Sequence, residues 1–182
     1  MIILFVCTGN TCRSPLAMFL LRNLLAEFQV GSEKCQVMSA GLAANPGQPM
    51  SQAAVDCLPE SDQPQARAYA ARQLDAGLLS AADWVLCMTN EQASWLKKAA
   101  ADMAGKILSL GQAAAICCDR LTDSGKFPQE SGPVTDCGLY DRDIPDPYGG
   151  SAELYQRTAR LIRQDLQPIA AYLAAYGKLS LA

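Results

Sequence analysis

The sequence contains no histidine, and this absence excludes a large group of chemistries. Without imidazole, the chain cannot form a Ser–His or Cys–His catalytic pair or a zinc site with histidine ligands. It has 8 cysteines but no C-x-x-C pair, and 8 are few for a disulfide-stapled scaffold of 182 residues. A nucleophilic enzyme of this composition must activate its nucleophile in another way, and we expect no metal and no cofactor.

The sequence also lacks an excess of positive charge and a long apolar run. Its 15 Lys and Arg against 18 Asp and Glu give a net charge of −3, so a basic footprint for nucleic acid is missing. No apolar run approaches the roughly 18 residues that suggest a membrane span. The apolar stretch 1–6 is too short for a signal peptide and lacks a basic leader. These features predict a cytoplasmic protein without a nucleic-acid or membrane partner, whose oligomeric state stays open.

Strand patterns alternate with helical patterns along the chain. The branched, apolar run 2–6 is typical of a strand buried on both faces, and a tight turn and a helix to about residue 28 follow it. This alternation predicts a single α/β domain, residues 1–182, with a mainly parallel sheet. Further strands are expected at 35–39, 83–88 and 107–110, and further helices at 51–58, 90–104 and 151–176.

The stretch 119–149 is rich in proline and glycine and is predicted to be a long loop. Long loops are unusual inside one domain and often functional. We place a loop insertion in the domain at about 111–140, which is either a solvated insertion or a segment that shapes substrate access.

The segment 7–14 reads CTGNTCRS and follows the first strand, where parallel α/β folds bind ligands. A cysteine, five residues and an arginine let backbone N–H groups surround a tetrahedral oxyanion at the positive end of the next helix. Gly9 permits the tight backbone, and Arg13 offers a planar fork of donors to two phosphate oxygens. Arginine and a helix N-terminus favour the thiolate of Cys7, and Ser14 can donate to it.

The C-x5-R pattern alone occurs by chance in many chains. Here it follows a buried strand, contains Gly-Asn and leads through Ser14-Pro15 into a helix, and this context makes it informative. A thiolate facing a bound phosphate is placed for in-line attack. The segment therefore predicts phosphoryl transfer to sulfur without a histidine.

With these residues in view, the chain resembles the low-molecular-weight protein-tyrosine phosphatase family. The resemblance rests on CTGNTCRSP at 7–15 and IPDPYGGS at 144–151, and segments at 39–49, 72–74 and 82–89 support it. It implies a four-stranded parallel sheet flanked by helices on both sides and a phosphorylated protein as substrate.

The resemblance also implies residue roles. Cys7 would attack phosphorus, Arg13 would stabilise the transition state, and Asp146 would protonate the leaving group and then activate water. Asp141 and Asp143 are competitors for the acid role but lack the following Pro-Tyr. The residues that would bind phosphate are Thr8, Gly9, Asn10, Thr11, Cys12, Arg13 and Ser14.

Cys12 and Tyr69 carry further expectations. Cys12 would form a disulfide with an oxidised Cys7 and protect it from over-oxidation, or it merely fills the loop. Tyr69 stands where the family often has histidine, three positions before Arg72, and this leaves the local hydrogen bonding open.

Thr11 and Tyr148 bear on the choice of substrate. Many tyrosine-specific members carry a bulkier aliphatic residue in place of Thr11, whereas CTGNTCRS resembles a bacterial subgroup that acts on phosphoarginine in proteins. A β-branched hydroxyl favours a polar guanidinium over a phenol ring. Tyr148 would wall the pocket or is an ordinary half-buried tyrosine, and the Gly149-Gly150 continuation leaves a smaller aromatic wall. We therefore expect phosphoarginine, with phosphotyrosine as the alternative.

Two other functions stay open. A thioredoxin-linked arsenate reductase uses a similar loop but needs two further redox cysteines at a spacing that the remaining cysteines do not supply. A phosphate-binding module without turnover is the second, and the presence of Cys7, Arg13 and Asp146 together argues against it.

Overall fold

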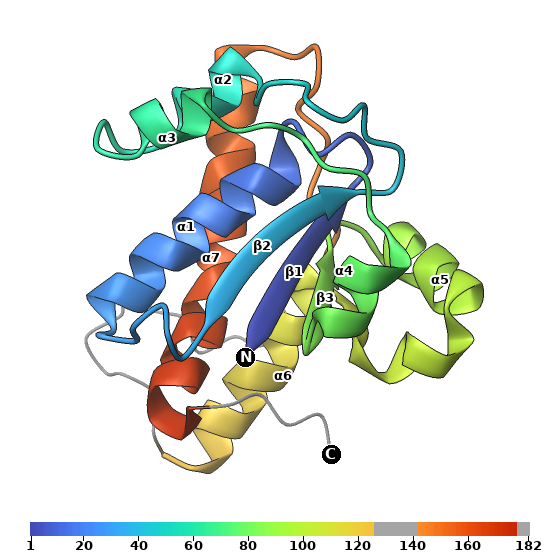
Figure 1. Cartoon of the computed structure of the whole chain (residues 1–182). Helices are drawn as coiled ribbons and strands as arrows, with labels where there is room; N and C mark the ends of the chain where they lie inside the picture. Colours follow the sequence, from blue (N-terminus) through green and yellow to red (C-terminus); the bar gives the residue numbers. More distant parts are fainter. Residues whose placement is uncertain (126–141, 178–182) are drawn as a thin grey trace.

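The computed structural model describes residues 1–125 and 142–177, which contain a four-stranded parallel sheet with helices on both faces (Figure 1). The strand order is β2-β1-β3-β4, and every pairing is parallel. This confirms the predicted fold class and the four strands. The strands are β1 (Ile2–Cys7), β2 (Gln36–Gly41), β3 (Trp84–Cys87) and β4 (Ile107–Ser109).

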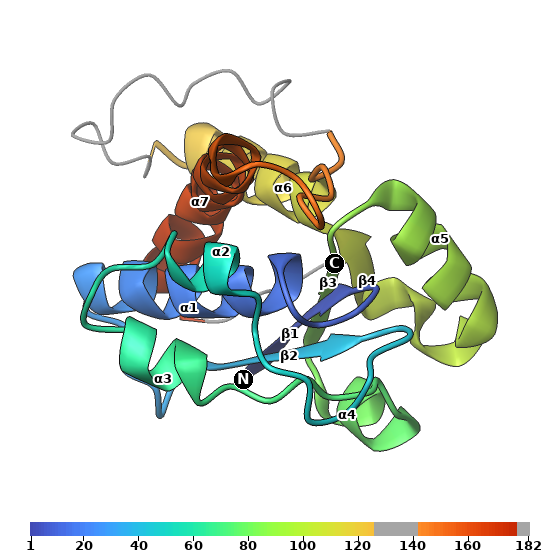
Figure 2. The same cartoon turned by 90° about the horizontal axis from the view of Figure 1, so that it is seen from above.

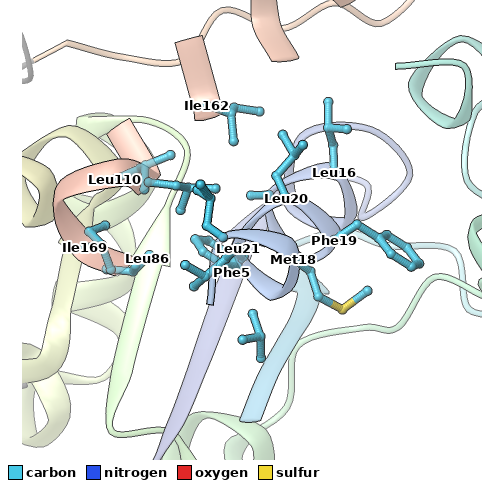
Figure 3. Packing of buried hydrophobic residues seen from close by; sticks show 14 of the residues in the cluster. Phe5, Leu16, Met18, Phe19, Leu20, Leu21, Leu86, Leu110, Ile162 and Ile169 are labelled. Atoms are coloured by element: carbon cyan, nitrogen blue, oxygen red, sulfur yellow. The ribbon is translucent and has the colours of Figure 1, made fainter. Parts of the chain in front are cut away.

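Alternate residues of β1 face two separate hydrophobic cores. Ile3 and Phe5 belong to the larger core, which α1, α6 and α7 cover, and Figure 3 shows Phe5 beside Leu21 of α1. Leu4 and Val6 belong to the smaller core under α4 and α5. Each fully buried side chain of this kind contributes about 1.5–3 kcal/mol, so β1 is fixed from both faces. The helices are α1 (Arg13–Glu27), α4 (Ala76–Ala81), α5 (Asn90–Ala99), α6 (Leu110–Asp123) and α7 (Ala152–Tyr176).

Two short helices, α2 (Gln52–Val55) and α3 (Gln63–Arg67), lie in the connection between β2 and β3. Viewed from above, α2 lies across α1 and beside α7 (Figure 2). A 3₁₀ helix, η1 (Ala101–Lys106), follows α5, so the helix expected over 90–104 ends early at Ala99. Among the described residues, no helix combines the length and the hydropathy that a membrane crossing needs.

The structure corrects the predicted loop insertion over its first part. Residues 110–123 form helix α6, which packs against α7. Ser109 accepts a hydrogen bond from the Gln112 backbone while the Gln112 side chain accepts one from Ser109, and this capping box starts the helix directly after β4. Leu110, Cys117 and Leu121 point into the core, so helical spacing was present in the sequence. Residues 126–140 of the proposed insertion lie outside the described residues.

Candidate active site

The phosphate loop, residues 7–14, connects β1 to α1 and curls at the carboxyl end of the sheet. Asn10 takes φ = 56°, a left-handed conformation that asparagine tolerates better than most side chains. The loop lies directly against the end of β2, where a Cβ on Gly41 would come within 2.6 Å of the Thr8 carbonyl oxygen. The Ser-Ala-Gly segment therefore ends in glycine because the loop needs that space.

The Cys7 thiol is buried at the base of this loop, with 3% of the residue exposed. Its Sγ lies 2.9 Å from the Ser14 hydroxyl oxygen and accepts a hydrogen bond from the Asn10 backbone N–H at 3.3 Å. The Asn10 side-chain amide donates to the same Ser14 oxygen at 2.9 Å, and the Ser14 hydroxyl has two acceptors within reach, the sulfur and the Ala40 carbonyl oxygen at 3.3 Å. The Asn10 backbone N–H and the Ser14 hydroxyl thus both lie within hydrogen-bond distance of the sulfur, and the donor role expected of Ser14 stays a prediction.

A tyrosine from outside the loop fixes Asn10 from behind. The Tyr69 hydroxyl donates to Asn10 Oδ1 at 2.6 Å, and the Arg72 backbone N–H donates to the same oxygen at 2.8 Å. Since the Tyr69 proton goes to an amide oxygen, the Ser39 hydroxyl at 2.7 Å donates to Tyr69. Burial raises the pKa of Tyr69, which keeps its donor proton in place. The sequence had left the local hydrogen bonding open, because Tyr69 stands where the family often has histidine. In the structure, Tyr69 supplies a hydrogen bond to Asn10 at this position.

Arg13 joins the two ends of the chain. Its side chain is 6% exposed, and its guanidinium donates to the Ile144 carbonyl oxygen at 3.1 Å and to Asp146 Oδ2 at 2.5 Å. The Asp146 side chain is 50% exposed, and its other oxygen accepts from the Tyr148 backbone N–H. A guanidinium has five N–H donors, so the fork retains donors for an anion.

The acid loop, residues 142–151, is anchored at its start. Ile144 donates its backbone N–H to the Met88 carbonyl oxygen at the end of β3, and Asp143 accepts from the backbone N–H of Asn90 at the start of α5. Asp143 is therefore occupied away from the pocket, which removes it as a competitor to Asp146. The other competitor, Asp141, lies outside the described residues.

The two loops enclose a pocket of about 230 Å³, the size of one side-chain head rather than of a large cofactor. Asn10 and Ser14 stand behind the pocket and support the loop. Gln48 also lines the pocket, and it lies in the segment 39–49 that supported the family resemblance without being named as a site residue. The described residues contain no cluster of three or more side chains that could hold a metal ion. The lining residues are Cys7, Thr8, Gly9, Thr11, Cys12, Arg13, Gln48, Asp146 and Tyr148.

Cys12 faces partners that the sequence did not indicate. Its thiol donates to Ser51 Oγ at 3.3 Å and lies 3.4 Å from the Tyr155 hydroxyl of α7. Burial, and then the hydrogen bond with Cys12, raise the pKa of Tyr155 to about 12. Cys7 and Cys12 are both free thiols here, so the predicted redox pairing stays a prediction.

Thr8 also has a distant partner. Gln92 of α5 donates its side-chain amide to Thr8 Oγ1 at 3.1 Å, and its amide oxygen accepts from the Met88 backbone N–H. Gln48, Ser51, Gln92 and Tyr155 reach the site from other elements, so no local spacing marks them.

Known proteins resemble this chain in sequence and in fold. The family model for low molecular weight phosphotyrosine protein phosphatase matches residues 2–115. A protein-arginine-phosphatase of Bacillus subtilis is 28% identical over 94% of this chain and 95% of its own length. The low molecular weight protein-tyrosine-phosphatase Wzb of Salmonella typhimurium is 30% identical over 95% of this chain and 94% of its own.

Among solved structures, a C7S mutant of the arginine phosphatase YwlE with a phosphorylated active-site serine superposes with a TM-score of 0.69. It is 25% identical, and the match covers 95% of each chain. The family model covers more than half of the chain, and the solved relatives share its four-stranded fold. The chain therefore belongs to the low-molecular-weight phosphotyrosine protein phosphatase family, and it is a protein phosphatase.

Proposed function

We propose that the chain hydrolyses phosphoarginine in proteins through a cysteinyl-phosphate intermediate, with Cys7, Arg13 and Asp146 as its catalytic residues. The observation that carries this proposal is that sulfur, guanidinium and carboxylate line one pocket of side-chain size. Each group has the chemistry of its step, and the pocket leaves room for one phosphorylated side chain between them.

In the first step, the Cys7 thiolate attacks phosphorus and the bond to the substrate nitrogen breaks. Asp146, as a carboxylic acid, gives its proton to that nitrogen, and Arg13 with the loop N–H groups holds the phosphoryl oxygens. In the second step, the Asp146 carboxylate takes a proton from water, the water oxygen attacks phosphorus, and the S–P bond breaks to restore the thiolate. The phosphorylated serine in the YwlE mutant supports transfer to the side chain at this position.

Two polar side chains that line the pocket support phosphoarginine. Thr11 and Gln48 line it, and the Thr11 hydroxyl lies 3.7 Å from Cys12 Sγ rather than in a strong hydrogen bond. A guanidinium carries N–H donors that hydroxyl, amide and carboxylate oxygens can accept, whereas a phenol ring needs apolar contact. The arginine phosphatase of Bacillus subtilis, which matches the chain over nearly its whole length, supports the same substrate.

Phosphotyrosine is the second candidate, and Tyr148 favours it. This side chain is 72% exposed beside the pocket, where its ring could lie against an aromatic substrate. The tyrosine phosphatase Wzb is as similar to the chain as the arginine phosphatase.

Matched phosphopeptides decide between the two substrates. We expect a higher kcat/KM for a phosphoarginine peptide than for the same peptide with phosphotyrosine. In Thr11→Ile, which replaces the hydroxyl with apolar bulk, the ratio should shift towards phosphotyrosine by roughly 10-fold, the size of about 1.4 kcal/mol of differential binding. A wild type that prefers phosphotyrosine, or a ratio that Thr11→Ile leaves unchanged, would refute the phosphoarginine assignment.

A further inference from the structure

A second hollow, which we call the side groove, adjoins the catalytic pocket. It shares Thr11, Gln48 and Tyr148 with that pocket and runs over α2 to Arg67 at the end of α3. Its volume of about 530 Å³ exceeds that of the catalytic pocket, and Met50 and Val55, both buried, line it. The two hollows therefore form one continuous surface, with the reacting atoms at one end.

Backbone hydrogen bonds fix the wall of the side groove on both sides. Ser51 donates its N–H to the Thr11 carbonyl oxygen at 2.9 Å, so the wall is attached to the phosphate loop itself. On the other side, Ala71 donates to the Gln48 carbonyl oxygen at 2.8 Å, and Gly47 donates to that of Ala71. A surface held in this way is formed before a ligand arrives, which lowers the entropic cost of binding.

Arg67 gives the side groove its charge. It is the one charged residue among the described residues that line the groove, and it is exposed at the end of α3. Its guanidinium contacts the neutral Gln63 side chain at 2.9 Å. Two acids near α2 and α3 have other partners, since Asp56 accepts from Gln52 and Asp62 accepts from Asn23 of α1.

We propose that the side groove binds the stretch of substrate polypeptide next to the phosphorylated residue, and that Arg67 selects an acidic side chain in that stretch. This inference rests on the proposed function, because it requires a protein substrate. A phosphorylated side chain in the catalytic pocket holds its own backbone at the Thr11–Tyr148 boundary, where the side groove begins. The neighbouring residues then cross buried apolar side chains and end beside an exposed cation, which fits an apolar and acidic sequence.

Peptides that differ only in one flanking charge test the inference. Two series, one with phosphoarginine and one with phosphotyrosine, carry glutamate or lysine at successive positions on either side of the phosphorylated residue. In the wild type, glutamate should give a higher kcat/KM than lysine on one side, by roughly two- to fivefold, as expected for an exposed ion pair. Arg67→Ala should abolish this preference, and Arg67→Glu should reverse it in favour of lysine.

Lys98→Glu is the matched control. It makes the same change in charge on the exposed face of α5, away from the side groove, and should keep the wild-type preference for glutamate. A preference that appears only with phosphotyrosine peptides would support the side groove and refute the phosphoarginine assignment. No preference on either side, a preference that survives Arg67→Glu, or a wild type that hydrolyses p-nitrophenyl phosphate but neither peptide series would overturn the inference.

Discussion

The phosphate loop and the acid loop meet at the same pocket, but they are held in opposite ways. In the phosphate loop, residues 10–14 are buried, and Cys7, Asn10 and Ser14 hydrogen-bond to one another. The acid loop is largely exposed at its tip, and its position depends on β3, α5, α7 and Arg13. The proposed nucleophile is thus placed mainly by contacts within its own segment, which Tyr69 and Arg72 support from outside, whereas the proposed acid is placed by packing from across the chain.

This contrast matches the two tasks. A thiolate needs donors at fixed distances, so a stiff, self-contained loop suits it. A general acid must meet leaving groups of different shape, and Asp146 keeps half of its side chain exposed while Arg13 holds one of its oxygens. Variants of the residues that contact the Cys7 sulfur should therefore slow the reaction alike for all leaving groups, and variants in the acid loop should slow it unequally.

Cys7→Ser should have the largest effect. Serine keeps the hydrogen bonds from Asn10 and Ser14 but is a much poorer nucleophile than a thiolate, so we expect kcat to fall by at least about 10⁴-fold for every leaving group. Steady-state hydrolysis of a series of aryl phosphates measures the loss. The half-buried Cys57 offers the matched control, because Cys57→Ser changes the same atom away from the pocket. Activity that survives Cys7→Ser would refute the proposed nucleophile.

Asp146→Asn should separate the two loops most clearly. The amide retains the size of the carboxylate but cannot give up a proton to the leaving group. We expect kcat/KM for aryl phosphates with poor leaving groups to fall by about 10²-fold or more, and that for good leaving groups to fall much less, because kcat/KM covers the steps through loss of the leaving group and not the later attack of water. A plot of log kcat/KM against the pKa of the leaving phenol should become steeper than in the wild type. An equal loss across the series would contradict the acid role.

The same contrast explains what the sequence could predict. Cys7, Arg13 and Ser14 lie in one short segment after an apolar strand, so their spacing was enough to bring them together. Asp146 was identified by family resemblance, because no local pattern shows that a residue near position 146 will meet Arg13. Tyr69 and Gln92 were missed as supports, since each reaches the phosphate loop from another element through one side chain.

The prediction of a loop over helix α6 was wrong for a different reason. The capping box of α6, its apolar spacing and Gly111 near its start were visible in the sequence, but the proline- and glycine-rich stretch that begins at 119 favoured a loop. Glycine costs a helix about 1 kcal/mol relative to alanine, and the burial of several side chains, including Leu110 and Leu121, outweighs this cost. Tertiary packing therefore decided the element, and local propensity did not.

Tyr69→Phe tests whether the phosphate loop is as self-contained as its local contacts indicate. The change removes the hydroxyl that donates to Asn10, a residue with a left-handed backbone, and leaves the Arg72 backbone N–H as the remaining donor to the same oxygen. We expect a loss of about 1 kcal/mol in the free energy of unfolding and a several-fold fall in kcat for all leaving groups. Tyr69→His, which restores a donor of the kind that the family often carries, should recover part of the activity. If the Tyr69→Phe variant matches the wild type in urea unfolding and in kcat, the phosphate loop does not need the hydrogen bond from Tyr69.

Asp165→Asn probes the far anchor of the acid loop and should have the smallest effect on activity. Asp165 is fully buried on α7 and binds Arg142 at 2.8 Å, and its second oxygen lacks a hydrogen-bond partner among the described residues.

Burial raises the pKa of Asp165 from 3.8 to about 7, more than the Arg142 guanidinium lowers it. Between pH 3.8 and about 7, Asp165 therefore carries a proton in the folded state and has lost it in the unfolded chain. The stability that this proton contributes is lost as the pH rises towards 7. The asparagine of the Asp165→Asn variant cannot titrate, so the free energy of unfolding of the variant relative to the wild type should increase over that range. Urea midpoints at successive pH values measure this difference. A difference in midpoint that stays constant with pH would mean that Asp165 does not titrate there, and that the acid loop is anchored to a permanent charge pair.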